Sequence, residues 1–364
     1  MSNITTYIKF RGDLSMKSYP FNEVDALILS DLSYIRFENI VPTVNEKASI
    51  SIAGAAKKYI KVKGREVAFY ERFENLLNIM AKSPRYANLM LSNYVSQTNA
   101  DEGQQFSAIH IEINPFLTFI AFRGTDETLV GWREDCNMSY IMPVPAQISS
   151  VKYVNETAKG VFKKYMIGGH SKGGNLAIYS SVFCEQAVQN KITAVYSFDG
   201  PGFNKSMIVE DGYQQIKNRI YAYVPESSFV GMLMEHEESY KVVKSEAVAF
   251  LQHDGFSWCV EGTHFETLDT IDEFSNNLNF LLKAWMDKID HAERKVFVDA
   301  IFDVFEAGGL EDVMGFKEIN IHTATAMLKA VANLPKDQRD TVGKVIKMLI
   351  DESKKKKGDA YEIN

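Results

Sequence analysis

Apolar residues recur at helical spacing through the first part of the chain. Up to about residue 90 they stand three and four positions apart, which is the spacing of a buried helix face. One stripe comprises Val24, Leu27, Ile28 and Leu32, and a second comprises Phe73, Leu76, Leu77 and Met80. We therefore predict a mainly helical lead-in over residues 1–90.

From residue 93 the spacing changes to that of strands. Segments 94–96 and 106–111 flank a polar, glycine-containing stretch, 98–105, and together they predict a β-hairpin. His110 alternates within this hairpin, so we expect it at the surface. The run 116–122 is almost continuously apolar, which is typical of a central strand covered on both faces.

Further strands alternate with helical segments. Apolar runs at 165–168, 192–198, 219–224, 240–243 and 247–251 predict strands, with helices between them. This alternation predicts a mostly parallel sheet with helices on both faces. After residue 290 helical stripes return, one of Phe297, Ile301, Val304 and Phe305 and one of Val342, Val345, Ile346 and Leu349. We expect an α/β domain over 1–290, a helical appendage over 291–352 and a basic, polar tail over 353–364.

Composition narrows the class of protein. The chain has 364 residues, 46% of them hydrophobic, enough for one large domain with an appendage. A net charge of −7 argues against a general nucleic-acid binder. Three cysteines are too few and too scattered for a disulfide framework or a zinc ribbon. We find no signal-peptide pattern and no apolar run of spanning length, so we expect a cytoplasmic protein without a transmembrane segment.

The clearest candidate for a catalytic motif is the segment Gly169-His170-Ser171-Lys172-Gly173. This G-x-S-x-G sequence follows an apolar strand and opens directly into a helical segment, the form of a nucleophile elbow. The start of the following helix would place a positive dipole end where negative charge develops in acyl transfer. We predict Ser171 as a nucleophile; the alternative is a tight structural turn.

A serine nucleophile needs an imidazole base and a carboxylate that orients it. In hydrolases with an elbow these partners follow in the order acid, then histidine, each in a loop after a later strand. Asp199, which follows the first strand after the elbow helix, is the first acid candidate, and Glu226, after the next strand, is the alternative. His253, after the last strands, is the favoured base, and His264 is the alternative.

Two other histidines are set aside. His170 adjoins the serine, where its ring cannot easily reach the hydroxyl. His236 opens a partial H-E-x-x-H sequence, but Tyr240 stands where the second histidine belongs, so no metal site follows. We expect neither a metal nor an organic cofactor.

The remaining parts of the site are an oxyanion hole and an acyl-binding wall. We expect oxyanion donors at the backbone N–H of Lys172, after the nucleophile, and of Thr125 in the loop after an early strand. Segment 229–234 is rich in flexible apolar side chains, and we predict Phe229 and Met232 as substrate contacts. The alternative is that this segment is plain core.

At these residues the chain resembles a known group. Phe122-Arg123-Gly124-Thr125, the Trp132 and Asp135 that follow, and the elbow are similar to class 3 (fungal-type) lipases of the α/β-hydrolase superfamily. The chain also resembles an uncharacterised bacterial family of lipase-like hydrolases, labelled a domain of unknown function. That likeness extends to about residue 310 and is carried by segments 11–14, 20–27, 169–175, 225–233 and 252–258.

The resemblance implies an α/β-hydrolase fold with serine esterase or lipase chemistry, in which Ser171 is the nucleophile and Thr125 and Lys172 are the oxyanion donors. One departure concerns the acid. Class 3 lipases usually carry it after the second strand beyond the elbow, where this chain has Glu226 and no aspartate. Asp199 instead looks like the acid of pancreatic-type lipases.

Together these patterns predict a serine hydrolase that cleaves a small-molecule or lipid ester through an acyl-enzyme. An acyltransferase or thioesterase would use the same residues. A different class, a non-catalytic binding module that uses its pocket or its C-terminal helices for a partner, is the second hypothesis. Under either hypothesis the C-terminal helices could form an oligomer contact.

Overall fold

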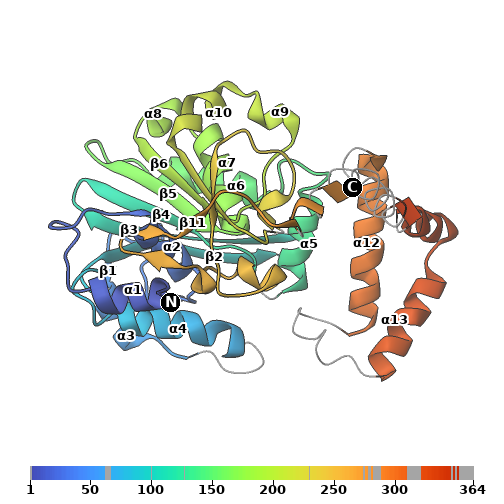
Figure 1. The fold of residues 1–364 in the computed structure, drawn as a ribbon, viewed down its shortest axis with the longest axis horizontal. Helices are drawn as coiled ribbons and strands as arrows, with labels where there is room; N and C mark the ends of the chain where they lie inside the picture. The colour runs from blue at the N-terminus through green and yellow to red at the C-terminus, as the bar shows by residue number, and fades with distance from the viewer. Residues whose placement is uncertain are drawn as a thin grey trace.

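The computed structural model describes residues 2–61, 67–99, 101–126, 128–228, 230–273, 275–277, 280–281, 288–309, 321–345, 347–348 and 351. Its centre is a nine-stranded sheet with strand order β1-β2-β3-β4-β5-β6-β7-β8-β11 (Figure 1). The strands of this sheet are β1 (Ile50–Ser51), β2 (Met90–Asn99), β3 (Gln104–Asn114), β4 (Leu117–Phe122), β5 (Lys164–His170), β6 (Ile192–Phe198), β7 (Ile220–Pro225), β8 (Tyr240–Val243) and β11 (Thr267–Leu268). A separate pair joins β9 (Val260–Glu261) to β10 (His264–Phe265).

The centre of the sheet is parallel and its margins are antiparallel. Strands β4 to β8 pair in parallel, whereas β2 and β3 form the predicted antiparallel hairpin and β3 pairs antiparallel with β4. The carboxyl ends of β4, β5, β6 and β7 therefore meet at one edge. Side chains that follow these strands are brought together there.

The N-terminal helices cover one face of the sheet (Figure 1). They are α1 (Ile4–Arg11), α2 (Glu23–Leu32), α3 (Ile52–Lys58) and α4 (Val67–Met80). The Asn22 side chain caps α2 by accepting from the backbone N–H groups of Val24 (3.0 Å) and Asp25 (3.2 Å). The buried Asp25 carboxylate accepts from Arg85 Nε at 2.8 Å, which ties α2 to the chain beyond α4. The predicted stripes at 24–32 and 73–80 are confirmed as buried faces of α2 and α4.

A second set of helices covers the opposite face and packs on its own hydrophobic core. Of these, α6 (Pro145–Thr157) and α7 (Lys172–Phe183) pack against each other and on strands β3 to β6. The remaining helices between β4 and β7 are α5 (Leu129–Asn137), α8 (Gln186–Gln189), α9 (Lys205–Ile208), α10 (Asp211–Ile216) and the 3-10 helix η1 (Lys217–Arg219). Three short 3-10 helices follow, η2 (Val230–Met232), η3 (Ala249–His253) and η4 (Gly255–Ser257).

Two local predictions were wrong. Residues 247–251 are not a strand, because they enter η3, which is fixed by a hydrogen bond from Trp258 Nε1 to the Gln252 carbonyl (2.8 Å). His110 is buried, since α6 covers its face of the hairpin and Thr157 Oγ1 lies 3.0 Å from its Nε2. This burial lowers the pKa of His110 to about 3.

After residue 290 the chain returns to helix, as α12 (His291–Ala307) and α13 (Ile321–Asn333). Helix α12 packs on α5 through Val298 and Phe302, which contact Leu129, and Arg133 pairs with Asp299 at 2.7 Å. The expected tail at 353–364 lies outside the described residues, and so do Ile346 and Leu349 of the last stripe. A mixed sheet between helical layers, with a strand–turn–helix at its centre, is an α/β-hydrolase fold, as the sequence predicts.

Candidate active site

The elbow forms at the end of β5, with Ser171 between the strand and α7. Ser171 adopts φ +59° and ψ −132°, a conformation that L-residues rarely take. Its N–H donates to the Phe198 carbonyl at 2.8 Å, which fixes the turn to β6. A Cβ atom on Gly173 would lie 2.2 Å from the Phe122 carbonyl oxygen. Only glycine allows the β4 end to approach the elbow this closely.

Asp199 and His253 meet beside the elbow. His253 Nδ1 lies 2.6 Å from Asp199 Oδ2. The other oxygen of this fully buried carboxylate, Oδ1, accepts from Ser228 Oγ (2.5 Å) and from the Gly231 N–H (3.0 Å). Because both carboxylate oxygens are engaged, the Asp199 side chain has one fixed orientation toward the imidazole.

The alternative acid and base lie elsewhere. Glu226 follows β7, where its backbone N–H donates to the Val243 carbonyl at 3.1 Å. Within the part of the chain that the structure describes, no hydrogen bond joins its carboxylate to His253 or His264. The His264 side chain is 71% exposed on β10, with its Nδ1 4.0 Å from Glu23 Oε1. The structure thus brings Ser171, His253 and Asp199 together and leaves Glu226 and His264 apart.

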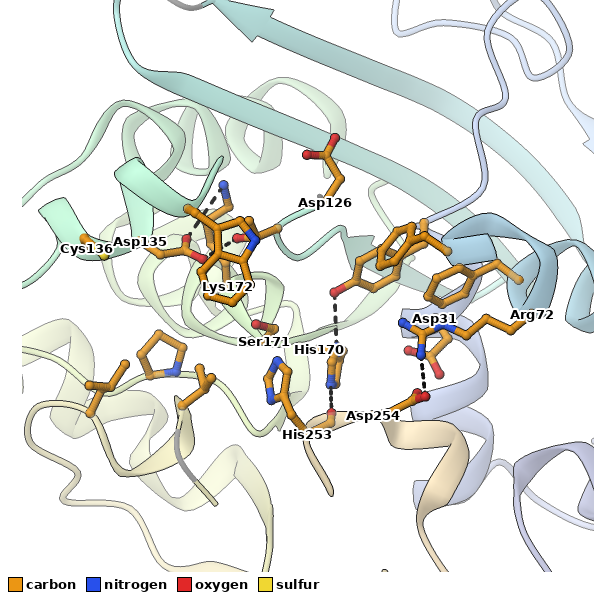
Figure 2. Close-up of a pocket in the computed structure, with 18 of the residues that line it drawn as sticks. Asp31, Arg72, Asp126, Asp135, Cys136, His170, Ser171, Lys172, His253 and Asp254 are labelled. Carbon is orange, nitrogen blue, oxygen red and sulfur yellow. Dashed lines mark hydrogen bonds and ion pairs between the residues drawn. The ribbon is translucent and has the colours of Figure 1, made fainter. Parts of the chain in front are cut away.

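Ser171 and His253 face each other in the pocket (Figure 2). No hydrogen bond between the Ser171 hydroxyl and the His253 ring is present among the described residues. Such contacts are often long in unliganded hydrolases and shorten when substrate binds. Asp199 holds Nδ1 of the His253 ring, so Nε2 is the ring nitrogen outside this contact.

The expected oxyanion residues line the same pocket. Lys172 is the first residue of α7, so its N–H has no partner in a preceding helical turn. Thr125 follows β4, and its Oγ1 donates to Asp135 Oδ2 at 2.5 Å. Burial raises the pKa of Asp135 to about 6, and the nearby Lys172 cation and the Thr125 hydrogen bond act in the opposite direction.

The side chain of Lys172 is a feature that sequence reasoning missed. Its ammonium lies 2.9 Å from Glu134 Oε2, with both side chains essentially inaccessible to solvent. It also donates to the carbonyl and side-chain oxygens of Gln105, at 3.1 and 3.2 Å. This buried ion pair ties the start of α7 to α5 and β3, and so fixes the backbone that carries the expected oxyanion donor.

The pocket has a volume of about 310 Å³ and two differently built walls. On one side it is mostly apolar, lined by Trp132, Cys136, Pro201, Val230, Leu233 and Met234. Phe229, one of the two expected substrate contacts, lies outside the described residues. Met232, the other, packs in a small core with Val224 and Val242. Its neighbours Leu233 and Met234 face the cavity instead.

The other wall comes from the N-terminal helices, which sequence reasoning did not connect to the site. Asp31, Tyr34, Phe69, Arg72 and Phe73 line it. Figure 2 shows Arg72 and Asp31 beside Asp254, which directly follows His253. Burial and the neighbouring Asp254 raise the pKa of Asp31 well above its ordinary value. No pattern in the sequence signals these contacts, because apolar spacing predicts only that α2 and α4 are buried.

Alanine at Gly124 is expected to disturb this wall and the oxyanion loop together. A Cβ there would lie 2.1 Å from the Tyr34 hydroxyl and 2.5 Å from the His170 carbonyl oxygen. We expect the Gly124→Ala variant to lose about 1–3 kcal/mol of unfolding free energy, as overpacked sites do, measured by urea denaturation. Gly343→Ala is the control, since nothing lies within 4 Å of the added atom. Equal stability of the wild type and Gly124→Ala would show that the contact is easily relieved.

His236, the other histidine that the sequence singles out, lies outside the pocket. His236 Nδ1 lies 3.0 Å from Glu238 Oε1, a local pair away from the elbow. Across the described ranges, His, Cys, Asp and Glu side chains form no group of three arranged to hold a metal ion. Among the same residues, no helix is both long and apolar enough to cross a membrane.

Comparison with solved structures finds distant neighbours. The M37 lipase is 14% identical over 44% of this chain and 63% of its own, with a TM-score of 0.33. A fungal lipase–inhibitor complex is 16% identical over 60% of this chain and 75% of its own, with a TM-score of 0.37. The Rhizomucor miehei lipase propeptide complex is 16% identical over 52% and 64%, with a TM-score of 0.33. This chain thus spans slightly less than two thirds of the M37 and Rhizomucor miehei chains.

Comparison of the sequence itself gives a clearer result. No curated protein matches it. A family profile, Mbeg1-like, matches residues 80–303, which is more than half of the chain and includes Ser171, Asp199 and His253. The chain therefore belongs to the Mbeg1-like family.

Proposed function

We propose that this protein is a serine hydrolase that cleaves carboxylic esters through an acyl-enzyme, with Ser171, His253 and Asp199 as its triad. The observation that carries the proposal is the 2.6 Å contact of His253 Nδ1 with the fully buried Asp199, directly beside a strained elbow serine. A nucleophile, a base and a group that orients the base are the minimum for acyl transfer by serine.

Each residue has a defined part in this reaction. His253 Nε2 accepts the Ser171 proton as Oγ attacks the ester carbonyl, and the backbone N–H groups of Lys172 and Thr125 stabilise the oxyanion. The C–O bond to the alcohol then breaks, and His253 returns the proton to the leaving oxygen. A water molecule, deprotonated by the same imidazole, hydrolyses the acyl-enzyme and restores Ser171.

The pocket favours an ester with an apolar acyl group. Apolar side chains of α5 and of the segment around η2 line one wall, and an acyl chain buried there would gain about 0.8 kcal/mol per CH₂. A thioesterase, which cleaves a thioester in place of the oxygen ester, would use the same residues. So would an acyltransferase, in which an acceptor alcohol replaces water. Turnover of matched oxygen esters and thioesters of one acyl chain would separate these reactions.

Labelling by a fluorophosphonate probe tests the proposal. We expect the folded wild type to form a covalent adduct on Ser171, because the probe reacts with activated serines, and to hydrolyse p-nitrophenyl acetate. Ser171→Ala is expected to lose both. A folded wild type that neither labels nor turns over esters would refute the proposal and leave the binding-module hypothesis. Ser206→Ala is a matched control, since Ser206 is an exposed serine outside the pocket.

A further inference from the structure

His170 holds the main chain of His253. His170 Nε2 lies 2.6 Å from the His253 carbonyl oxygen. Because a carbonyl only accepts, Nε2 must carry the proton, and in a neutral ring Nδ1 is then an acceptor. The Tyr34 hydroxyl, 3.1 Å from Nδ1, is the donor that completes this arrangement. Burial lowers the pKa of His170 well below its ordinary value, which keeps the ring neutral.

Arg72 holds the next residue of the same loop. Its guanidinium forms an ion pair with Asp254 and lies over the rings of Phe73 (4.8 Å) and Phe69 (5.1 Å). The Phe256 ring, two residues beyond Asp254, is a third aromatic contact of the guanidinium, at 5.6 Å. Aromatic contacts on several sides restrict the guanidinium, so the Asp254 carboxylate meets a fixed partner.

Both groups come from the N-terminal segment and act on a loop more than 180 residues away in sequence. Tyr34 follows α2, and Arg72 lies on α4. Both precede the range that the family profile matches, 80–303. Tyr34 stacks on Phe73, with centroids 4.6 Å apart and an interplanar angle of 9°, so the two groups form one packed unit.

We propose that Tyr34 and Arg72 are positioning residues for His253, Tyr34 acting through His170 on the His253 carbonyl and Arg72 acting through Asp254. The inference rests on the proposed function, in which His253 is the base. Asp199 fixes the direction of the imidazole, while these two groups fix the backbone from which it projects. A base displaced by 1 Å loses about two orders of magnitude in rate, so restraint of the backbone bears directly on kcat.

The test compares Tyr34→Phe, Arg72→Lys and Arg72→Met in the full chain. We expect Tyr34→Phe and Arg72→Met each to lower kcat for p-nitrophenyl acetate roughly tenfold, with KM changed less than about twofold, because the loop is less well placed. Arg72→Lys, which keeps a cation beside Asp254, should recover part of the loss.

Tyr59→Phe is the matched control. It also removes a tyrosine hydroxyl, but this one donates to Glu74 Oε1 of α4 at 3.3 Å and not to His170. Tyr59 does not line the pocket, so the kcat of Tyr59→Phe should equal that of the wild type. The inference is overturned if Tyr34→Phe and Arg72→Met lower the melting temperature but keep wild-type kcat in the folded fraction. A wild type that reacts with no ester or fluorophosphonate would instead overturn the proposed function, and this inference with it.

Discussion

Replacing Asp199 with asparagine is expected to lower kcat for ester hydrolysis by about 10⁴-fold while the protein stays folded. Ser228 Oγ and the Gly231 N–H both donate to Oδ1, so the amide oxygen of asparagine would occupy that position. Its NH₂ group would then face His253 Nδ1 and force that nitrogen to accept. The proton moves to Nε2, and the ring can no longer take the proton of Ser171. Steady-state kinetics with p-nitrophenyl acetate measures the loss.

Glu226→Gln is the control for this prediction, because it makes the same chemical change at the other acid considered from the sequence. We expect its kcat to remain within about twofold of wild type, since residues outside a catalytic unit have small effects on the chemical step. A large loss in Glu226→Gln with an active Asp199→Asn would reverse the assignment of the acid.

Removing the charge of Lys172 is expected to destabilise the fold by about 3–5 kcal/mol. In Lys172→Met the Glu134 carboxylate would stay buried without its cation, and it is held in place by the backbone N–H groups of Gln105 (3.1 Å) and Ala146 (2.9 Å). Urea denaturation measures the loss of unfolding free energy. The double variant Lys172→Met, Glu134→Gln removes both charges and should recover only part of the stability, because the glutamine NH₂ then faces one of these two N–H donors.

An exposed pair provides the comparison. Lys163 and Glu112 form an ion pair with side chains about one third exposed, and Lys163→Met is expected to cost only about 0–1 kcal/mol. If Lys172→Met cost no more than Lys163→Met, the buried pair would contribute nothing beyond a surface contact, and a role in fixing the oxyanion backbone would be untenable.

Local sequence patterns are sufficient to predict the central strands and the elbow of this molecule. The central strands are short apolar runs, and a G-x-S-x-G turn between a strand and a helix has few structural solutions. Ser171 and Asp199 could be proposed together because each directly follows a parallel strand of the sheet, and parallel strands place those loops at one edge. His253 instead lies at the end of η3. The short apolar run at 247–251, which predicts a strand, enters a 3-10 helix instead.

Contacts between residues that lie far apart in the sequence could not be predicted from local patterns. The stripe of α4 shows that Phe73 is buried but not that Arg72, beside it, meets Asp254. The sequence predicts a role only for the Lys172 backbone, because a lysine inside an elbow gives no sign of which carboxylate its ammonium will contact. His110 was misplaced for the same reason, as alternation in a strand does not reveal a covering helix.

The N-terminal segment forms hydrogen bonds with strands β9 and β10, and this affects how the chain folds during translation. The Phe265 N–H donates to Glu23 Oε1 across 242 residues, and the Val260 N–H donates to the Ser2 carbonyl. During translation the first helices emerge long before these partners exist, and contacts so distant in sequence form slowly. Tyr34 and Arg72 cannot complete the pocket around His253 until His253 itself has left the ribosome. The nascent chain therefore carries its serine elbow in an incomplete pocket until residues 253–265 have been synthesised.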